Sequence, residues 1–159
     1  ILGAVGFVAY NGYTASAKIS ASKEQHYSVK KFIEASYAQC ALGSDYVEMK
    51  TCEQNNWSCN GLRVGNSPPG TVKRPCNSGA GSASNSAYHF VFHFNNSGFK
   101  NPYNTIAPGV RSGFGYTVGQ VNISSTGNVN NMARLNFMTC LKEPCSGSNI
   151  IEEFVYFQE

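Results

Sequence analysis

The cysteines are the side chains best suited by type and number to do chemistry. There are six of them: Cys40, Cys52, Cys59, Cys76, Cys140 and Cys145. The sequence has no CxxC or CxxCH motif, and no histidine stands at zinc-ligand spacing to a cysteine, so we expect disulfides in an oxidising compartment rather than a metal or haem site. Sequence proximity favours three pairs: Cys40 with Cys52, Cys59 with Cys76, and Cys140 with Cys145.

Acid–base chemistry finds little support. Asp45 is the only aspartate, and the neighbouring Glu152 and Glu153 point to opposite faces if they lie on a strand. His89 and His93, read as strand residues, would be about 13 Å apart, too far to hold one ion. Nucleophile elbows, phosphate-binding loops and zinc-protease motifs are missing from the sequence. We therefore expect no enzyme activity, no metal and no cofactor.

Chain length and charge further limit which kind of protein this can be. A chain of 159 residues suits one domain, and 42% hydrophobic with 13% charged residues indicates a compact fold rather than disorder. The net charge of +3, from 12 basic and 9 acidic residues, is too small to imply nucleic acid as an obligatory partner. Contact between DNA and Lys30-Lys31 or Lys73-Arg74 stays open, although solvated charge is the favoured interpretation.

The elements that must position these residues begin with a helix over residues 1–41. From residue 19 onward, apolar and aromatic positions recur at helical spacing and predict a stripe that faces a core. Its members are Ile19, His26, Val29, Ile33, Tyr37 and Cys40. Gly43 is expected to end the helix.

Before residue 18 this helix has a different character, because apolar groups surround it and no charged face is left. A helix of about 40 residues would be roughly 60 Å long, more than the diameter of such a domain, so its first half should project. The apolar run as given is too short to cross a bilayer. We expect the chain to start partway through a longer apolar helix.

The remaining residues, 42–159, are expected to form a globular unit that we call the head. Residues 44–84 read as a loop region braced by disulfides. Strands are predicted near 88–94, 115–125, 132–141 and 150–157. Together with the helix they predict an α+β fold, in which the long helix packs on one face of a roughly four-stranded antiparallel sheet.

The opening stretch ILGAVGFVAYNGYTASAK resembles the segment of type IV pilins after the leader and the first apolar turns, commonly ILAAIAIPAYQDYxARxK. The matching positions are Ile1, Leu2, Ala4, Ala9, Tyr10, Tyr13 and Ala15. The cysteine-bounded MTCLKEPCSG near the C-terminus also agrees with the family outline. The chain departs from the pattern at Val8, where pilins usually carry proline, and in having six cysteines rather than one pair.

The resemblance implies a filament subunit. Residues 1–18 would lie in a filament core and residues 19–41 would pack on the head. The core residues would be Ile1, Leu2, Gly3, Ala4, Val5, Gly6, Phe7, Val8, Tyr10 and Tyr13. It further implies a homopolymer outside a bacterial cell, held in the inner membrane before assembly machinery extrudes it, and used for adhesion, motility or DNA uptake.

Two alternatives remain open at this stage. One lies within the same family: a pseudopilin of a secretion system or a minor pilin. The other is a secreted, disulfide-rich module that binds carbohydrate through Trp57 and exposed tyrosines, with residues 1–18 buried as an ordinary core helix.

Overall fold

The fold is α+β, as the sequence predicts, and is dominated by one long N-terminal helix. A computed structural model describes residues 2–50, 70–76, 82–129 and 132–158. The described elements include the helices α1 (Leu2–Ala41) and α2 (Ser82–Asn96), the hairpin strands β1 (Tyr46–Lys50) and β2 (Thr71–Pro75), and the hairpin strands β3 (Lys100–Asn101) and β4 (Asn104–Pro108). The main sheet contains β5 (Val110–Ser112), β6 (Val121–Val129), β7 (Met132–Cys140) and β8 (Ile150–Gln158), with a short 3-10 turn, η2 (Gly147–Asn149), before β8.

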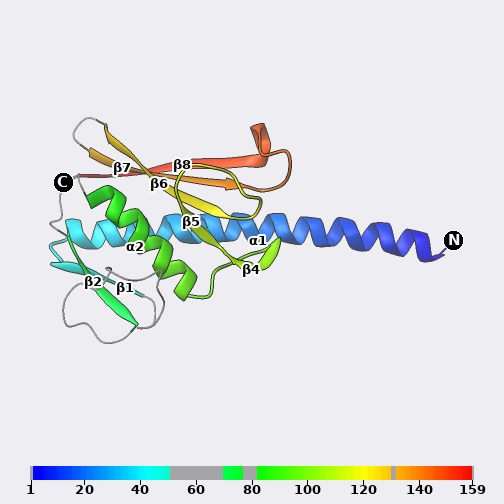
Figure 1. Ribbon diagram of the computed structural model, residues 1–159, viewed down its shortest axis with the longest axis horizontal. Helices are drawn as coiled ribbons and strands as arrows, with labels where there is room; N and C mark the ends of the chain where they lie inside the picture. Colours follow the sequence, from blue (N-terminus) through cyan, green and yellow to red (C-terminus); the bar gives the residue numbers. More distant parts are fainter. Residues whose placement is uncertain (1, 51–69, 77–81, 130–131, 159) are drawn as a thin grey trace.

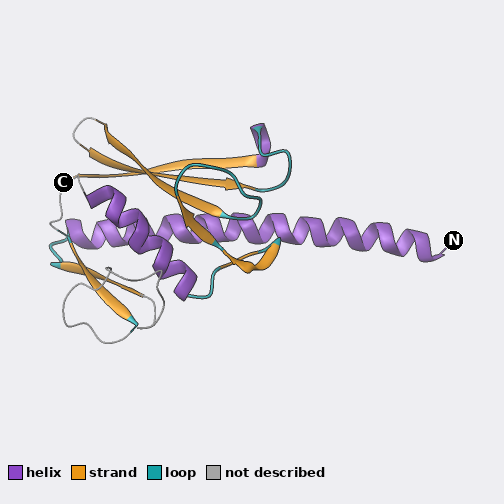
Figure 2. Cartoon of the chain, viewed as in Figure 1, coloured by secondary structure: helices purple, strands orange, loops and turns teal. Residues whose placement is uncertain are grey.

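The two helices lie between the main sheet and the β1–β2 hairpin, and α1 continues well past the head toward its N-terminus (Figures 1 and 2). One core joins these layers. It contains Val29 and Ile33 from α1, Met49 from β1, Phe90 and Phe94 from α2, and Ile123, Leu135 and Phe137 from the sheet. This core holds only the later part of α1, because the earlier turns have no layer above or below them (Figure 1).

The packed part of α1 follows the predicted stripe, with His26, Val29 and Ile33 fully buried. Ser22 and Ser36 are also buried, and each hydroxyl donates to the carbonyl four residues earlier, at 2.8 and 2.7 Å. These bonds remove the cost of burying an unpaired hydroxyl. The helix ends as predicted.

Gly43 provides that ending, since its φ of 94° lies in the left-handed region that favours glycine. Its N–H donates to the Cys40 carbonyl at 3.0 Å.

The main sheet has the order β5-β6-β7-β8. β6, β7 and β8 pair antiparallel, but β5 pairs parallel with β6, so the predicted all-antiparallel sheet is wrong at this edge. The chain returns from the end of β5 to the start of β6, and hydrogen bonds fix both ends of the return. Gly113 N–H donates to the Ile123 carbonyl at 3.0 Å, and Gly119 N–H to the Cys140 carbonyl at 2.7 Å.

The predicted strand at 88–94 is wrong, because these residues belong to α2. Over Tyr88–Phe94, Tyr or Phe occupies every second position, and this alternation imitates a strand. The buried apolar residues are instead spaced as one face of a helix: Ala87, Phe90, Val91 and Phe94. His89 and His93 are therefore one helical turn apart, and the strand-based separation does not apply.

The region from 44 to 84 contains the β1–β2 hairpin, which the sequence analysis missed. Its register runs from Tyr46 opposite Pro75 to Lys50 opposite Thr71. This pairing returns the chain to the end of α1, where Cys76 N–H donates to the Asp45 carbonyl at 2.9 Å.

The described disulfides are Cys40–Cys76 and Cys140–Cys145, each with Cα atoms 5.3 Å apart. The predicted pairs Cys40–Cys52 and Cys59–Cys76 are wrong, because the hairpin places Cys76 beside Cys40. The pair Cys140–Cys145 is confirmed. Cys52 and Cys59, like Trp57, lie outside the described residues.

Candidate functional site

The N-terminal half of α1 is the feature of the molecule that the head does not cover. Tyr13 is 74% exposed, and Ser22 is the first buried side chain among those described on this helix. Between them most side chains are small and exposed: Ala15, Ser16, Ala17, Ser20 and Ala21. Small residues allow a second helix to approach the backbone closely.

Most residues predicted to form a filament core lie on this one helix. Leu2, Gly3, Ala4, Val5, Gly6, Phe7, Val8, Tyr10 and Tyr13 are all within α1. Ile1 lies outside the described residues. At 40 residues the helix is roughly 60 Å long. The half of α1 that projects past the head (Figure 1) is thus one rod with a sequence that is apolar at its start.

A buried polar cluster fixes the other half of α1 to the sheet. His26 Nδ1 lies 2.9 Å from Thr139 Oγ1 on β7, and His26 Nε2 lies 3.4 Å from Glu153 Oε2 on β8. Lys30 Nζ forms an ion pair with the same carboxylate oxygen at 3.0 Å. Thr139 is fully buried, so this arrangement cannot present a nucleophile to a substrate. It orients the helix instead.

The pKa of His26 agrees with a structural role for this polar cluster. Burial lowers the pKa of His26 below its usual value, and the Glu153 carboxylate offsets part of that effect. The imidazole is therefore neutral near pH 7, and Glu153 has Lys30 as its charge partner.

The histidines of α2 also act in packing. His93 Nδ1 accepts the Lys50 backbone N–H at 2.9 Å, and its ring stacks on Phe32 with centroids 4.1 Å apart. Burial lowers the pKa of both His89 and His93 to about 4, with smaller contributions from Arg74 and Lys50 respectively. Among the residues that the structure describes, no group of three or more metal-binding side chains comes together.

Sequence reasoning missed the part that Thr139 and Glu153 play. A signal was present in IIEEFVYFQ, where two carboxylates interrupt an apolar strand. Strand alternation sends Glu153 toward the helices and Glu152 to the outer face, where Asn136 Nδ2 donates to Glu152 Oε1 at 2.8 Å. Locating the partner, however, required knowing that β8 lies over α1.

Comparison with known proteins gives no assignment, since no family model, no curated protein and no solved structure matches the chain. In the described part of the chain, no helix combines the length and hydropathy needed to cross a bilayer.

Proposed function

We propose that this chain is the major structural subunit of an extracellular type IV pilus. The observation that carries the proposal is the long rod of α1, whose projecting half holds the pilin-like stretch ILGAVGFVAYNGYTASAK (Figure 1). The ribbon of α1 carries the opening of that stretch beyond the layers of the head (Figure 1).

Assembly into a polymer would cover the projecting half of α1. Neighbouring copies would cover one another's rods, and each Å² of apolar surface removed from water contributes about 25 cal/mol. Gly3, Ala4 and Gly6 allow the rods to approach closely. A head-to-tail contact that does not close produces an open helix of subunits.

The partners follow from this role. Before assembly the apolar rod would be held in the inner membrane, and assembly machinery would supply the energy for extrusion. The filament would serve adhesion, motility or DNA uptake, with its chemistry limited to binding at the surface of the head.

The alternative of a secreted binding module is less well supported. It requires residues 1–18 to be buried in the head, whereas Tyr13 and most of its described neighbours on α1 are exposed.

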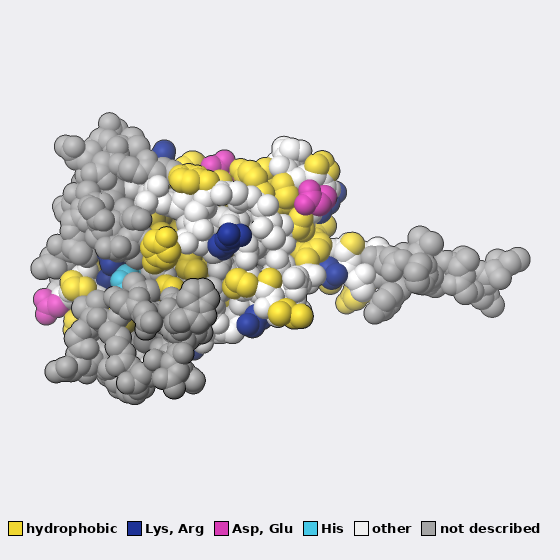
Figure 3. Space-filling view, in the orientation of Figure 1, with side chains coloured by type: hydrophobic (Ala, Val, Ile, Leu, Met, Phe, Trp, Pro, Cys, Tyr) yellow, Lys and Arg dark blue, Asp and Glu magenta, His cyan; other side chains and the backbone are white. Residues whose placement is uncertain are grey.

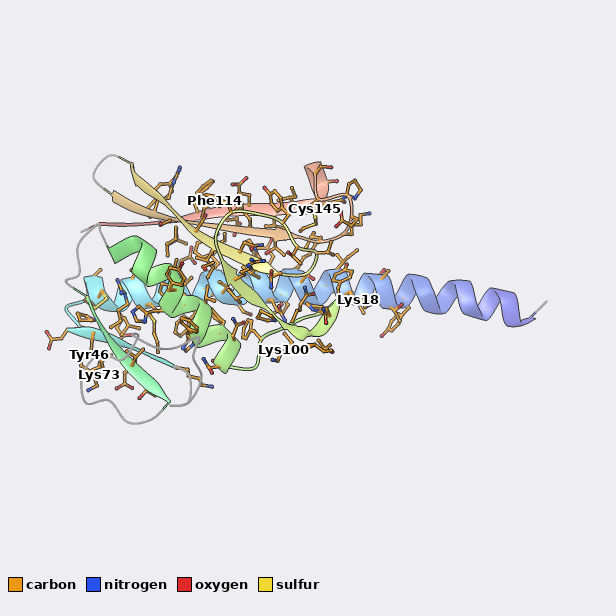
Figure 4. The ribbon with its side chains drawn as sticks, in the orientation of Figure 1. Lys18, Tyr46, Lys73, Lys100, Phe114 and Cys145 are labelled. Atoms are coloured by element: carbon orange, nitrogen blue, oxygen red, sulfur yellow. A yellow bond between two sulfur atoms is a disulfide. The ribbon has the colours of Figure 1, made fainter. Side chains whose placement is uncertain are left out.

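A charge placed in the rod tests the proposal. Phe7→Lys would put an ammonium in the filament core and should abolish filaments visible by electron microscopy of cells that assemble the full-length protein. Phe114→Lys is the matched control, because Phe114 is 73% exposed on the loop over the main sheet (Figure 4). The control should assemble normally. Normal filaments from Phe7→Lys would contradict the proposal.

A further inference from the structure

Among the large hydrophobic side chains that the structure describes, two on the head have the highest exposed fractions. Ile106 on β4 is 91% exposed and Leu42, directly after α1, is 88% exposed. Single exposed hydrophobic residues are common on protein surfaces. These two differ because rigid elements hold each of them at opposite ends of the head.

The end of the head from which the rod emerges, here the proximal end, carries Ile106 on the β3–β4 hairpin. Gln25 Nε2 donates to the Lys100 carbonyl at 2.6 Å, and Lys18 Nζ lies 5.4 Å from the centre of the Tyr103 ring. Tyr103 Oη also donates to the Leu141 carbonyl. The hairpin is thus fixed to α1 between Lys18 and Gln25, where the head begins.

The opposite, distal end carries Leu42 at the end of α1. The left-handed Gly43 and the Cys40–Cys76 disulfide hold this corner in place. Leu42 N–H donates to the Ala38 carbonyl at 3.0 Å, so its backbone is a rigid part of the last helical turn. The two apolar side chains are separated by roughly 25 to 35 Å along the helix axis, at 1.5 Å per residue.

The hairpin that carries Ile106 and the turn that follows Leu42 each carry an exposed charge, and the two charges are opposite in sign. Lys100 is exposed on the proximal hairpin, and Asp45 is exposed three residues after Leu42. Neither of them forms an ion pair with another residue in the described part of the chain.

The views agree with this placement. Figure 4 shows Lys18 and Lys100 toward the projecting rod and Tyr46, the neighbour of Asp45, at the far end. Figure 3 shows hydrophobic side chains near the point where the rod leaves the head, together with basic side chains and an acidic one.

From this arrangement we infer that successive copies of the chain dock head to tail, with Ile106 and Lys100 of one copy against Leu42 and Asp45 of the next. The inference rests on the proposed filament function and identifies which surfaces of the heads meet. Two different surfaces at opposite ends of the head allow a head-to-tail contact, which builds an open filament when it does not close. Complementary charges favour this pairing of ends over the contact of two like ends. Both side chains are held on ordered backbone, so little conformational freedom is lost on contact.

Cross-linking of assembled protein tests the contact directly. The double variant Ile106→Cys with Leu42→Cys, treated in filaments with a short thiol-reactive cross-linker, should give a ladder of multimers in a denaturing gel. Each single variant should give no ladder, because one new thiol cannot link both ends of a copy. Filaments of the double variant that yield only monomers would overturn the inference.

Charge exchange gives an independent readout. Lys100→Glu and Asp45→Lys should each reduce filament yield about tenfold, and the two together should restore it. Both sites are exposed, so the fold should be retained. If the wild-type protein forms filaments and both single variants also assemble fully, the docking contact alone is refuted. It is likewise refuted if the single variants assemble poorly and the double variant assembles no better. Absence of filaments from the wild-type protein would refute the proposed function, and the docking contact with it.

Discussion

At the scale of single residues, the adjacent Glu152 and Glu153 show how strand alternation assigns different roles to identical side chains. Glu153 faces α1, where its carboxylate forms an ion pair with Lys30 and lies close to the His26 ring. The exposed Glu152 accepts one hydrogen bond from Asn136. Through Glu153, the polar contacts of α1 reach β8 in addition to the apolar core that holds the same helix.

Replacing the two glutamates separately tests this distinction. Glu153→Gln removes the charge partner of Lys30 and should lower the free energy of unfolding by about 1 to 3 kcal/mol, measured by urea denaturation. Glu152→Gln keeps an amide oxygen for Asn136 and should change stability by less than about 0.5 kcal/mol. Equal effects of the two substitutions would contradict the arrangement.

The buried histidines predict a pH dependence with a defined sign. A base whose pKa is lower in the folded state binds fewer protons there than in the unfolded chain, so stability falls as pH falls below the unfolded value of about 6.5. His89 and His93, with pKa values of about 4 facing Arg74 and Lys50, should lose stability between pH 6.5 and pH 4. His26, facing Glu153 and Lys30, acts in the same direction.

The contribution of one histidine to this loss of stability can be measured at His89, which is 7% exposed. Its shift corresponds to at most about 3 kcal/mol. His89→Gln should therefore flatten the loss of unfolding free energy between pH 6.5 and pH 4, followed by denaturant titration at each pH. Parallel curves for the wild-type and variant proteins would show that His89 is not protonated on unfolding.

At the scale of elements, α2 gives the sharpest contrast between strand and helix. In a strand Tyr88 and Phe90 would share one face, but in α2 Phe90 is 1% exposed and Tyr88 is 47% exposed. Phe90→Ala should cost about 4 kcal/mol and Tyr88→Ala less than about 0.5 kcal/mol, by thermal or urea unfolding. Comparable losses at both positions would instead favour a strand.

The two described disulfides close loops of different length and should differ in their contribution. Cys40 and Cys76 are 36 positions apart, and Cys140 and Cys145 are 5 apart. Chain-entropy reasoning predicts that replacing the first pair by serines costs about 4 kcal/mol and the second about 2 kcal/mol. The measurement is the unfolding free energy of each double variant, and the reverse order would contradict the loop-length argument.

Elements with a strong local pattern were predictable from the sequence. The α1 stripe ended by Gly43, and the strands β6, β7 and β8, are recognisable because periodicity and turn residues agree there. The segment Tyr88–Phe94 was not, since its aromatic alternation fits a strand while its buried positions fit a helix. The β1–β2 hairpin depends on long-range pairing across residues 51–69, so proximity in sequence gave the wrong partner for Cys40.

At the scale of the whole molecule, the relation between the rod and the head governs the proposed function. Sequence length alone indicates that a helix of about 40 residues exceeds the head, and the structure describes α1 as continuous from Leu2 to Ala41. The proposed docking ends of the head were not predictable, because Ile106 is brought to the end opposite Leu42 by tertiary contacts of its hairpin with Lys18 and Gln25. The polar cluster around His26 could not be predicted either, because it joins residues of α1, β7 and β8 that are far apart in the sequence.

The central claim is that the rods of neighbouring copies cover one another in a polymer. Cryo-electron microscopy of native material sheared from cells tests it most directly. The account predicts helical filaments in which the segments of α1 before Ser22 pack together at the centre and the heads form the outer layer. Particles that are only monomers or closed oligomers, or filaments whose central density excludes these helices, would contradict it.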